Sequence, residues 1–316
     1  MENAPSYEHV AVILPCYNEE AAIGKVVQDF REALPGAKIY VYDNNSKDTT
    51  VQKALAAGAV VGRESRQGKG NVVRRMFSDV EADIYVLADG DDTYDAKSAP
   101  EMIGKLETEG LDMVVGSRLT RYEGDAFRRG HRLGNDLLTG CLGLFFGRTF
   151  TDILSGYRVF SRRYVKSFPA LSSGFETETE LSVHALQMRM PVAEVTTSYG
   201  ARPSGSSSKL RTYRDGIRIL TVMLVLFKEE RPLTFFSIIG AVLGVAALVL
   251  AIPVFITYFE TGLVPRFPTT ILSTGLMILA SLSFTCGLIL ETVTRGRREM
   301  KRLVYLSLPA PKRSVS

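Results

Sequence analysis

Short apolar segments alternate with amphipathic ones along the first part of the chain. Five segments have the composition of buried strands, rich in Val, Ile or Tyr: residues 9–14, 37–43, 59–64, 83–89 and 112–118. Four intervening segments have helical spacing of apolar residues or helix-capping residues: 17–34, 43–58, 68–80 and 98–110. This alternation predicts an α/β fold with a mostly parallel sheet and helices on both faces.

Two much longer apolar segments follow, residues 233–259 and 269–290, and neither contains a charged residue. Each exceeds the roughly 20 apolar residues that a helix needs to cross a bilayer core of about 30 Å. The alternative is a pair of buried core helices, but the residues after 290 are too few to bury them. We therefore expect two transmembrane helices.

Basic residues flank this pair of segments on its outer sides. "KEERP" precedes the first segment and "RGRREMKR" follows the second, whereas the connecting loop carries only Arg266. The positive-inside rule then predicts a protein of the inner or plasma membrane, with residues 1 to about 230 in the cytoplasm. The expected parts are a domain over 1–230, a two-helix anchor over 233–292 and a basic cytosolic tail over 293–316.

Other global features agree with this placement. The N-terminus lacks the basic and apolar regions of a signal peptide. Cys16, Cys141 and Cys286 show neither metal-ligand nor disulfide spacing, which fits a reducing compartment. The net charge is only +4. Much of that charge can come from the tail, so the lipid bilayer is the expected polyanionic partner and nucleic acid is not.

Polar and glycine-rich residues gather where the predicted strands end. Five such groups occur: residues 15–19, 43–49, 68–70, 89–92 and 116–118. Ligands of open α/β sheets bind beyond the carboxyl ends of the strands. We therefore expect one composite site rather than five separate loops.

The acidic loop "ADGDD" contains the residues most typical of a metal site. Asp89 and Asp91 are two positions apart, so in extended backbone both carboxylates point to one side. Mg²⁺ is commonly held by one or two carboxylates together with substrate phosphates. A solvated Asp-rich turn is the alternative, because Asp and Gly are common turn residues.

Six segments together resemble the family 2 glycosyltransferases of GT-A (Rossmann-like) fold, in the branch of dolichol- and polyprenyl-phosphate hexose synthases. They are "ILPCYNEE", "VYDNNSKDTT", "RQGKGNVVRRM", "VLADGDDTYD", "VVGSR" and "DILSGYRVFSRR". The resemblance covers residues 9 to about 230, and it implies that Asp89 and Asp91 bind Mg²⁺ or Mn²⁺. It also implies a set of nucleotide-binding residues: Pro15, Tyr17, Glu19, Asp43, Lys69, Gly70 and Asp89.

A basic and amphipathic region follows the fifth strand. The residues expected to hold an acceptor phosphate are Ser117, Arg118, Arg129, Arg132 and Asn135, since Arg can donate two hydrogen bonds to phosphate oxygens. The segments at about 131–147 and 210–228 fit interfacial helices, although the first also fits a core helix. "RPSGSSSK" resembles a loop that closes over the diphosphate, with Lys209 and Arg211 beside it; an ordinary linker is the alternative.

The family resemblance assigns a general base to Asp152, with Glu176 and Glu178 as rivals, and a catalytic metal-binding role to Asp91. A phosphate monoester, however, has a second pKa of about 6 and is already a nucleophilic dianion at neutral pH. A sugar hydroxyl would need a base, whereas such an acceptor needs only positioning. We therefore expect Asp152 to orient the arginines and the acceptor.

The predicted reaction is inverting transfer of a hexose from a UDP- or GDP-sugar to polyprenyl phosphate. One alternative is a glycosyltransferase acting on a glycan or glycolipid, although the chain has no Trp for a "QxxRW"-like acceptor motif. A second is a non-catalytic regulator that binds nucleotide sugars. The resemblance also implies a homo-oligomer, of the tetrameric kind. The sugar, the nucleotide, the polyprenol length and the pathway stay open.

Overall fold

The computed structural model of the chain describes residues 6–118, 140, 150–170, 176–200, 221 and 224–311. The chain divides into two compact units. The first comprises Met1–Ile217 together with Lys301–Ser316, and the second comprises Arg218–Met300.

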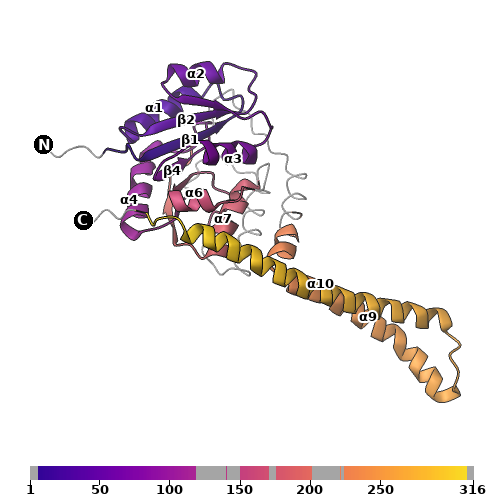
Figure 1. Cartoon of the computed structure of the whole chain (residues 1–316). Helices are drawn as coiled ribbons and strands as arrows, with labels where there is room; N and C mark the ends of the chain where they lie inside the picture. The colour runs from indigo at the N-terminus through magenta and orange to yellow at the C-terminus, as the bar shows by residue number, and fades with distance from the viewer. Residues whose placement is uncertain are drawn as a thin grey trace. The chain divides into compact units, whose positions relative to one another are not determined.

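A seven-stranded sheet forms the centre of the first unit, in the order β3-β2-β1-β4-β6-β5-β7 (Figure 1). Its strands are β1 (Val10–Cys16), β2 (Lys38–Asp43), β3 (Val60–Arg63), β4 (Ile84–Leu87), β5 (Met113–Ser117), β6 (Arg158–Ser161) and β7 (Val192–Thr196). Only β6 runs antiparallel to its neighbours within the described sheet. The predicted α/β fold with a mostly parallel sheet is therefore confirmed.

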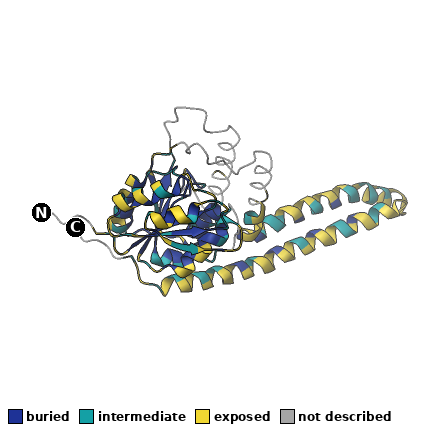
Figure 2. Cartoon of the chain, turned by 90° about the horizontal axis from the view of Figure 1, so that it is seen from above, coloured by how far each residue is buried: buried dark blue, intermediate teal, exposed yellow. Residues whose placement is uncertain are grey.

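Helices cover both faces of this sheet. The helices α1 (Ile23–Ala33), α2 (Thr50–Ala56) and α4 (Ala99–Glu109) pack on one face, in a core shared with alternate residues of β1. On the other face lie α3 (Lys69–Asp79), α6 (Arg162–Ser167) and α7 (Thr177–Met188). Phe77 of α3 meets Phe160 of β6 edge to face, and Phe160 stacks on Tyr164 of α6. Figure 2 shows the buried residues concentrated in the sheet and the helix faces against it.

Because β6 is antiparallel, the loop that precedes it lies at the edge of the sheet where the parallel strands end. The carboxyl ends of parallel strands share one edge, and an antiparallel strand begins at that same edge. Residues 150–157, the loop before β6, thus lie at the edge where β1, β2, β4 and β5 end.

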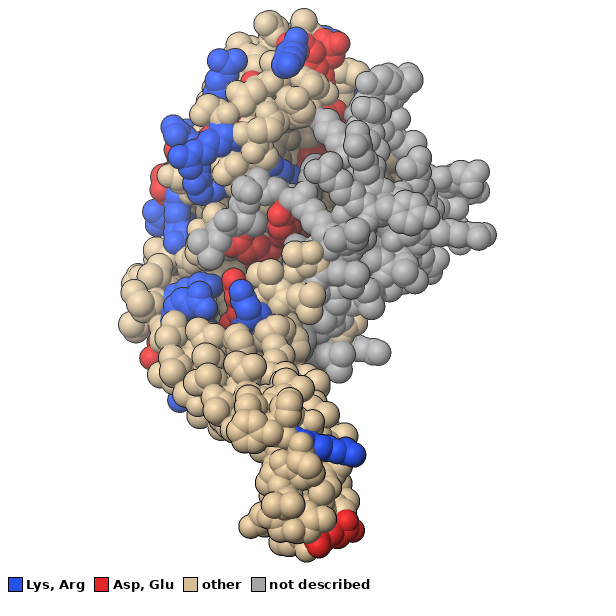
Figure 3. Space-filling view, turned by 90° about the vertical axis from the view of Figure 1, so that its right-hand side faces the viewer, with Lys and Arg blue, Asp and Glu red and all other residues tan. Residues whose placement is uncertain are grey.

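The second unit contains α9 (Pro232–Thr261) and the greater part of α10 (Phe267–Leu306). Both helices are long and apolar enough to cross a membrane, and only 11% of the most apolar window of each is buried. Large side chains such as Phe255 and Leu282 are more than half exposed. Figure 3 shows an almost uncharged surface along most of this part of the chain.

Small residues allow these two helices to pack closely. A Cβ on Gly240 would lie 3.0 Å from the backbone oxygen of Ala280, and one on Gly287 would lie 3.1 Å from Cβ of Phe236. Near the polar ends, the Arg298 guanidinium donates hydrogen bonds to the backbone oxygen and the carboxylate of Glu230.

The last turns of α10 belong to the first unit. Tyr305 donates a hydrogen bond of 2.8 Å to Oδ2 of Asp112, which is fully buried. Arg163 forms a two-pronged pair with the same carboxylate, and its guanidinium lies 4.7 Å from the centre of the Tyr305 ring. The helix thus continues through the basic residues that follow the second apolar segment.

Candidate active site

The loops after β1 and β2 are tied to one another by backbone and side-chain hydrogen bonds. The Asn18 amide donates to Oγ of Ser46 at 2.9 Å, and the Lys47 amide donates to Oδ1 of Asn18 at 2.8 Å. The Glu19 amide donates to Oγ1 of Thr50 at 2.9 Å. Residues 15–19 and 43–49 therefore lie side by side, with Pro15 in β1 itself and Tyr17 in the loop.

A buried pair of polar residues connects the end of β2 to the start of α3. Asp43 is fully buried, and both of its carboxylate oxygens accept a hydrogen bond from the backbone amide of Ser46, at 3.2 and 3.3 Å. The Asn44 amide group donates to two backbone carbonyls in the 64–66 loop, and its oxygen accepts the Gly68 amide at 2.7 Å. Asn44 was not among the predicted site residues, although a polar residue directly after a buried strand was the available signal.

The acidic loop after β4 lies against the end of β1. A Cβ on Gly90 would overlap Sγ of Cys16, so a glycine is required for this close approach. Asp91 is buried and accepts hydrogen bonds from the amide and the hydroxyl of Thr93, at 3.3 and 2.6 Å. Asp92 instead pairs with Lys25, at 2.6 Å.

Lys69, the first residue of α3, balances the charge of this loop. Its Nζ lies 2.5 Å from Oδ1 of Asp89 and 2.5 Å from Oε1 of Glu178 on α7. Burial by itself lowers the pKa of Lys69, but the two carboxylates outweigh it and raise that pKa above its ordinary value. The ammonium is therefore charged at any working pH.

The loop before β6 closes over these charges. The Gly156 amide donates a hydrogen bond of 2.9 Å to the Tyr94 hydroxyl. A Cβ on Gly156 would lie 2.9 Å from Oδ2 of Asp89 and 3.1 Å from Nζ of Lys69. The backbone at residue 156 is thus packed directly against the acidic loop and its lysine.

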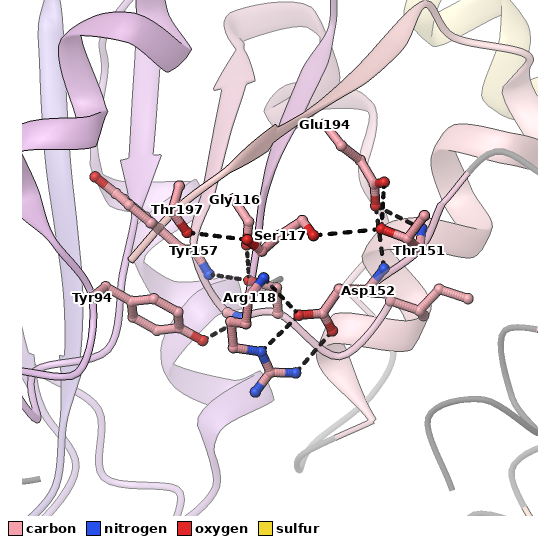
Figure 4. A network of polar contacts seen from close by, with 12 residues as sticks. Tyr94, Gly116, Ser117, Arg118, Thr151, Asp152, Tyr157, Glu194 and Thr197 are labelled. Carbon is pink, nitrogen blue, oxygen red and sulfur yellow. Dashed lines mark hydrogen bonds and ion pairs between the residues drawn. The ribbon is translucent and has the colours of Figure 1, made fainter. Parts of the chain in front are cut away.

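Arg118 and Asp152 form a second charged pair at the end of β5 (Figure 4). The guanidinium donates to both carboxylate oxygens, from Nε at 2.7 Å and from Nη2 at 2.8 Å, and the Arg118 amide adds a third hydrogen bond at 3.2 Å. Burial alone raises the pKa of Asp152, but the hydrogen bonds and charge of Arg118 hold it below its ordinary value. Asp152 is therefore a weak proton acceptor.

Neighbouring residues hold this pair in place. Glu194 of β7 accepts the amides of Thr151 and Asp152, at 2.8 and 3.2 Å. The Arg118 guanidinium lies over the ring of Tyr199, 5.5 Å from its centre, and that ring meets Tyr94 edge to face. Through these contacts the end of β5, the loop before β6 and the acidic loop form one connected site.

A buried arginine beneath the site was not predicted. Arg158 is fully buried at the start of β6, and its guanidinium donates to the backbone oxygens of Ser155 at 2.9 Å and Ile153 at 2.6 Å. Burial lowers the pKa of this guanidinium. Both carbonyls belong to the loop that carries Asp152 and Gly156, so Arg158 sets the path of that loop.

The structure thus brings Lys69 next to Asp89, and Ser117 and Arg118 next to Asp152, with Gly70 buried in the first turn of α3. Several predicted residues lie outside the described part of the chain: Arg129, Arg132, Asn135, Lys209 and Arg211. The same is true of most of the two segments expected to form interfacial helices, 131–147 and 210–228.

The carboxylates of the acidic loop can be compared with those of known sites for divalent metal ions. Within the described residues, no group of three or more His, Cys, Asp or Glu side chains could hold a metal ion alone. Asp89 and Asp91 provide two carboxylates, which is the number typical of Mg²⁺ sites that are completed by substrate phosphates. The residues present therefore fit a divalent ion that is bound together with a diphosphate.

Known proteins resemble this chain in sequence. The chain is 36% identical to the glycosyltransferase AglJ of Haloferax volcanii over 75% of its length and 78% of that protein. It is 27% identical to a dolichyl-phosphate hexose transferase of the same organism, over 72% of this chain and 97% of that one.

A solved structure also resembles it, that of glucosyl-3-phosphoglycerate synthase from Mycobacterium tuberculosis in complex with Mn²⁺, UDP-glucose and glycerol 3-phosphate. The TM-score is 0.54 and the identity 26%, over 69% of this chain and 79% of that one. Residues 11–168 match the profile of glycosyl transferase family 2. The chain therefore belongs to glycosyl transferase family 2 and is a glycosyltransferase, as its sequence motifs predicted.

Proposed function

We propose that the enzyme transfers a hexose from a nucleotide diphosphate sugar to polyprenyl phosphate, with inversion at the anomeric carbon and with the help of a divalent metal. The transferred product is a polyprenyl-phosphate-linked sugar. The relative named as a dolichyl-phosphate hexose transferase supports a lipid phosphate acceptor. The complex of the solved relative with Mn²⁺ and UDP-glucose supports a metal-assisted nucleotide sugar donor.

The pairing of Asp152 with Arg118 is the observation that carries this proposal. Asp152, to which the family resemblance assigns the general base, accepts three hydrogen bonds from Arg118, and its pKa is lowered. Glu178, a rival for the same role, lies 2.5 Å from the Lys69 ammonium. A carboxylate that is held by a guanidinium, as Asp152 is, is a poor proton acceptor, which favours an acceptor that is already ionised.

In this proposal, Arg118 and Ser117 hold the acceptor phosphate, with Arg129, Arg132 and Asn135 completing that site. Asp152 keeps the Arg118 guanidinium in a fixed orientation, so that the phosphate is positioned rather than deprotonated.

The donor occupies the other half of the site. Pro15, Tyr17, Glu19 and Asp43 would line the nucleoside, and Asp89 and Asp91 would hold Mg²⁺ or Mn²⁺. When bound, such an ion neutralises charge on the departing diphosphate. Lys69 and Gly70 would lie beside the nucleotide, and Lys209 and Arg211 would lie beside its diphosphate.

The two long apolar helices would place this chemistry at a membrane. We propose that α9 and α10 anchor the enzyme, with a cytoplasmic catalytic domain over residues 1–230 and the basic tail on the same side. Polyprenyl phosphate has its phosphate at the bilayer surface, so a cytoplasmic domain that is tethered to the bilayer suits this acceptor. A homo-oligomer is part of the same proposal.

The test is nucleotide release by the full-length protein in detergent or nanodiscs. UDP-glucose, UDP-N-acetylglucosamine, UDP-galactose and GDP-mannose are each supplied with and without polyprenyl phosphate, and again with EDTA. We expect release from one donor that requires both the lipid and a divalent metal. Transfer that needs a glycan acceptor, or nucleotide binding with no transfer to any acceptor, would refute the proposal.

A further inference from the structure

The Lys69 ammonium lies between two carboxylates that come from different elements. Its Nζ is 2.5 Å from Oδ1 of Asp89, in the loop after β4, and 2.5 Å from Oε1 of Glu178, on α7. The side chains of Lys69 and Glu178 are only 12% and 8% exposed, and that of Asp89 is 29% exposed. The more accessible of the two carboxylates is thus the one proposed to bind the metal.

Close packing keeps the ammonium at this position. Gly156 leaves no room for a side chain beside Asp89 and Lys69, since a Cβ there would lie 2.9 and 3.1 Å from their nearest atoms. Tyr94 is a further neighbour, because the same Cβ would lie 3.3 Å from its hydroxyl. The backbone of Lys69 is also fixed, as the first residue of α3.

One cation is shared here between two anions, so the ammonium offsets only part of their negative charge. Asp89 and Glu178 would repel each other if the lysine were removed, so a second cation would then be attracted to their carboxylates. A divalent ion bound by Asp89 would in turn lie within a few ångströms of Nζ and repel it. The lysine and the metal therefore compete for one carboxylate.

A diphosphate changes the outcome of this competition. Its oxygens offer the ammonium a new anionic partner close to Asp89, while Glu178 continues to hold Lys69 in the site. Asp89 can then bind the metal without leaving the lysine unpaired.

We propose that Lys69 is a placeholder cation that neutralises Asp89 in the ligand-free enzyme and passes to the diphosphate when the metal arrives. The inference rests on the proposed function, in which Asp89 is a metal ligand. Metal alone binds weakly because it must displace the lysine, and metal with nucleotide binds tightly. Lys69 thereby couples metal binding to nucleotide binding and disfavours a metal-loaded enzyme without substrate.

The test is a titration of full-length protein in detergent with Mn²⁺, with free Mn²⁺ followed by electron paramagnetic resonance, in the absence and presence of UDP. In the wild type, UDP should tighten Mn²⁺ binding by about 5- to 150-fold, the usual range of coupling between two ligands. In Lys69→Met, Mn²⁺ alone should bind at least about fivefold more tightly. Binding in the presence of UDP should not improve, so the coupling factor should shrink.

Two further variants separate this role from a structural one. Lys25→Met removes a lysine that pairs with Asp92 in the same acidic loop, and its Mn²⁺ affinity should match that of the wild type. Lys69→Met combined with Glu178→Gln removes the cation and its more buried partner together, so the Glu178 carboxylate is not left without its cation. This double variant should show the same tighter binding of Mn²⁺ alone.

The outcomes distinguish the two levels of the proposal. If Mn²⁺ binds the wild type with UDP, but neither Lys69 variant binds Mn²⁺ alone more tightly, the placeholder role is refuted and the metal site stands. If the wild type binds no Mn²⁺ even with UDP, the assignment of Asp89 and Asp91 to a metal fails, and both proposals fall with it.

Discussion

Replacement of Gly156 by Ala tests whether the acidic loop and the loop before β6 act as one site. Gly156 does not have a positive φ, so alanine is compatible with its backbone. The new Cβ would instead meet its neighbours, 2.9 Å from Oδ2 of Asp89 and 3.1 Å from Nζ of Lys69.

The size of the effect follows from these distances. Ordinary contact of a Cβ begins near 3.4 Å, so the Asp89 carboxylate must move by about 0.5 Å. A misplacement of about 1 Å can lower the rate about 100-fold, so half that shift corresponds to about tenfold in kcat/KM. Overpacking should also destabilise the protein by about 1–3 kcal/mol, or about 2–4 °C in Tm for each kcal/mol.

The assay is nucleotide release by full-length protein, together with thermal denaturation. Gly104→Ala in α4 is the matched control, because nothing lies within 4 Å of its new Cβ. Alanine is favoured over glycine inside a helix by about 0.5–1 kcal/mol, so this control should raise Tm slightly and leave the rate unchanged. The reasoning is refuted if Gly156→Ala keeps the kcat/KM of the wild type, or if both variants lose activity equally.

Three other changes probe the charged groups around the site. Asp152→Asn should lower the rate by about 10- to 100-fold through misplacement of its arginine partner. Its pH profile should keep the phosphate ionisation at about pH 6, whereas loss of an ionisation present in the wild type would mark Asp152 as a base. Arg158→Met leaves two backbone carbonyls unpaired and should lower stability by about 1–3 kcal/mol for each. The exposed pair of Arg162 offers a control, since Arg162→Met should change stability by no more than about 0.5 kcal/mol, and equal losses in thermal denaturation would contradict the prediction. Burial lowers the pKa of His184 from 6.5 to about 3. Between pH 6.5 and about pH 3, His184 is therefore protonated in the unfolded chain but neutral in the folded protein. The free energy of unfolding should fall by up to about 1.4 kcal/mol for each pH unit of acidification in this range. His184→Gln should reduce this dependence of stability on pH, as measured by thermal denaturation at about pH 7, 5.5 and 4.5. An unchanged dependence would show that His184 is not its source.

The strands and helices up to residue 118 were predictable because each is defined by local periodicity. The strand β6, Arg158–Ser161, was not predicted. Its place in the sheet comes from antiparallel pairing with β4 and β5, both of which precede it by more than 40 residues. No local pattern encodes such pairing.

The same holds in the site, where single residues could be recognised from the sequence but their contacts could not. Asp89 and Asp91 stood out as a metal-binding pattern, and Lys69 stood out as part of a glycine-rich helix start. The contact of Lys69 with Glu178 could not be predicted from the sequence, because α7 approaches α3 only through tertiary packing. The residue types at the strand ends could thus be read from the sequence, whereas the contacts between their side chains could not.

The apolar segments were identifiable from length alone, but their packing was not. Gly240 fits close helix contact either between subunits or within one chain. In the structure Gly240 contacts Ala280 of α10, so this glycine allows close packing within the second unit. A small-residue pattern shows that a close contact is possible, and only the structure shows with which helix.

The most direct test of the central claim compares two lipid acceptors that differ only in the phosphate. Full-length protein with its preferred nucleotide sugar and Mn²⁺ is supplied with polyprenyl phosphate or with the corresponding polyprenol, and the glycosylated lipid is measured. The account predicts product with polyprenyl phosphate alone, because an ionised phosphate needs no base while a hydroxyl does. Equal transfer to the polyprenol would contradict it, since a base would then have to act at this site.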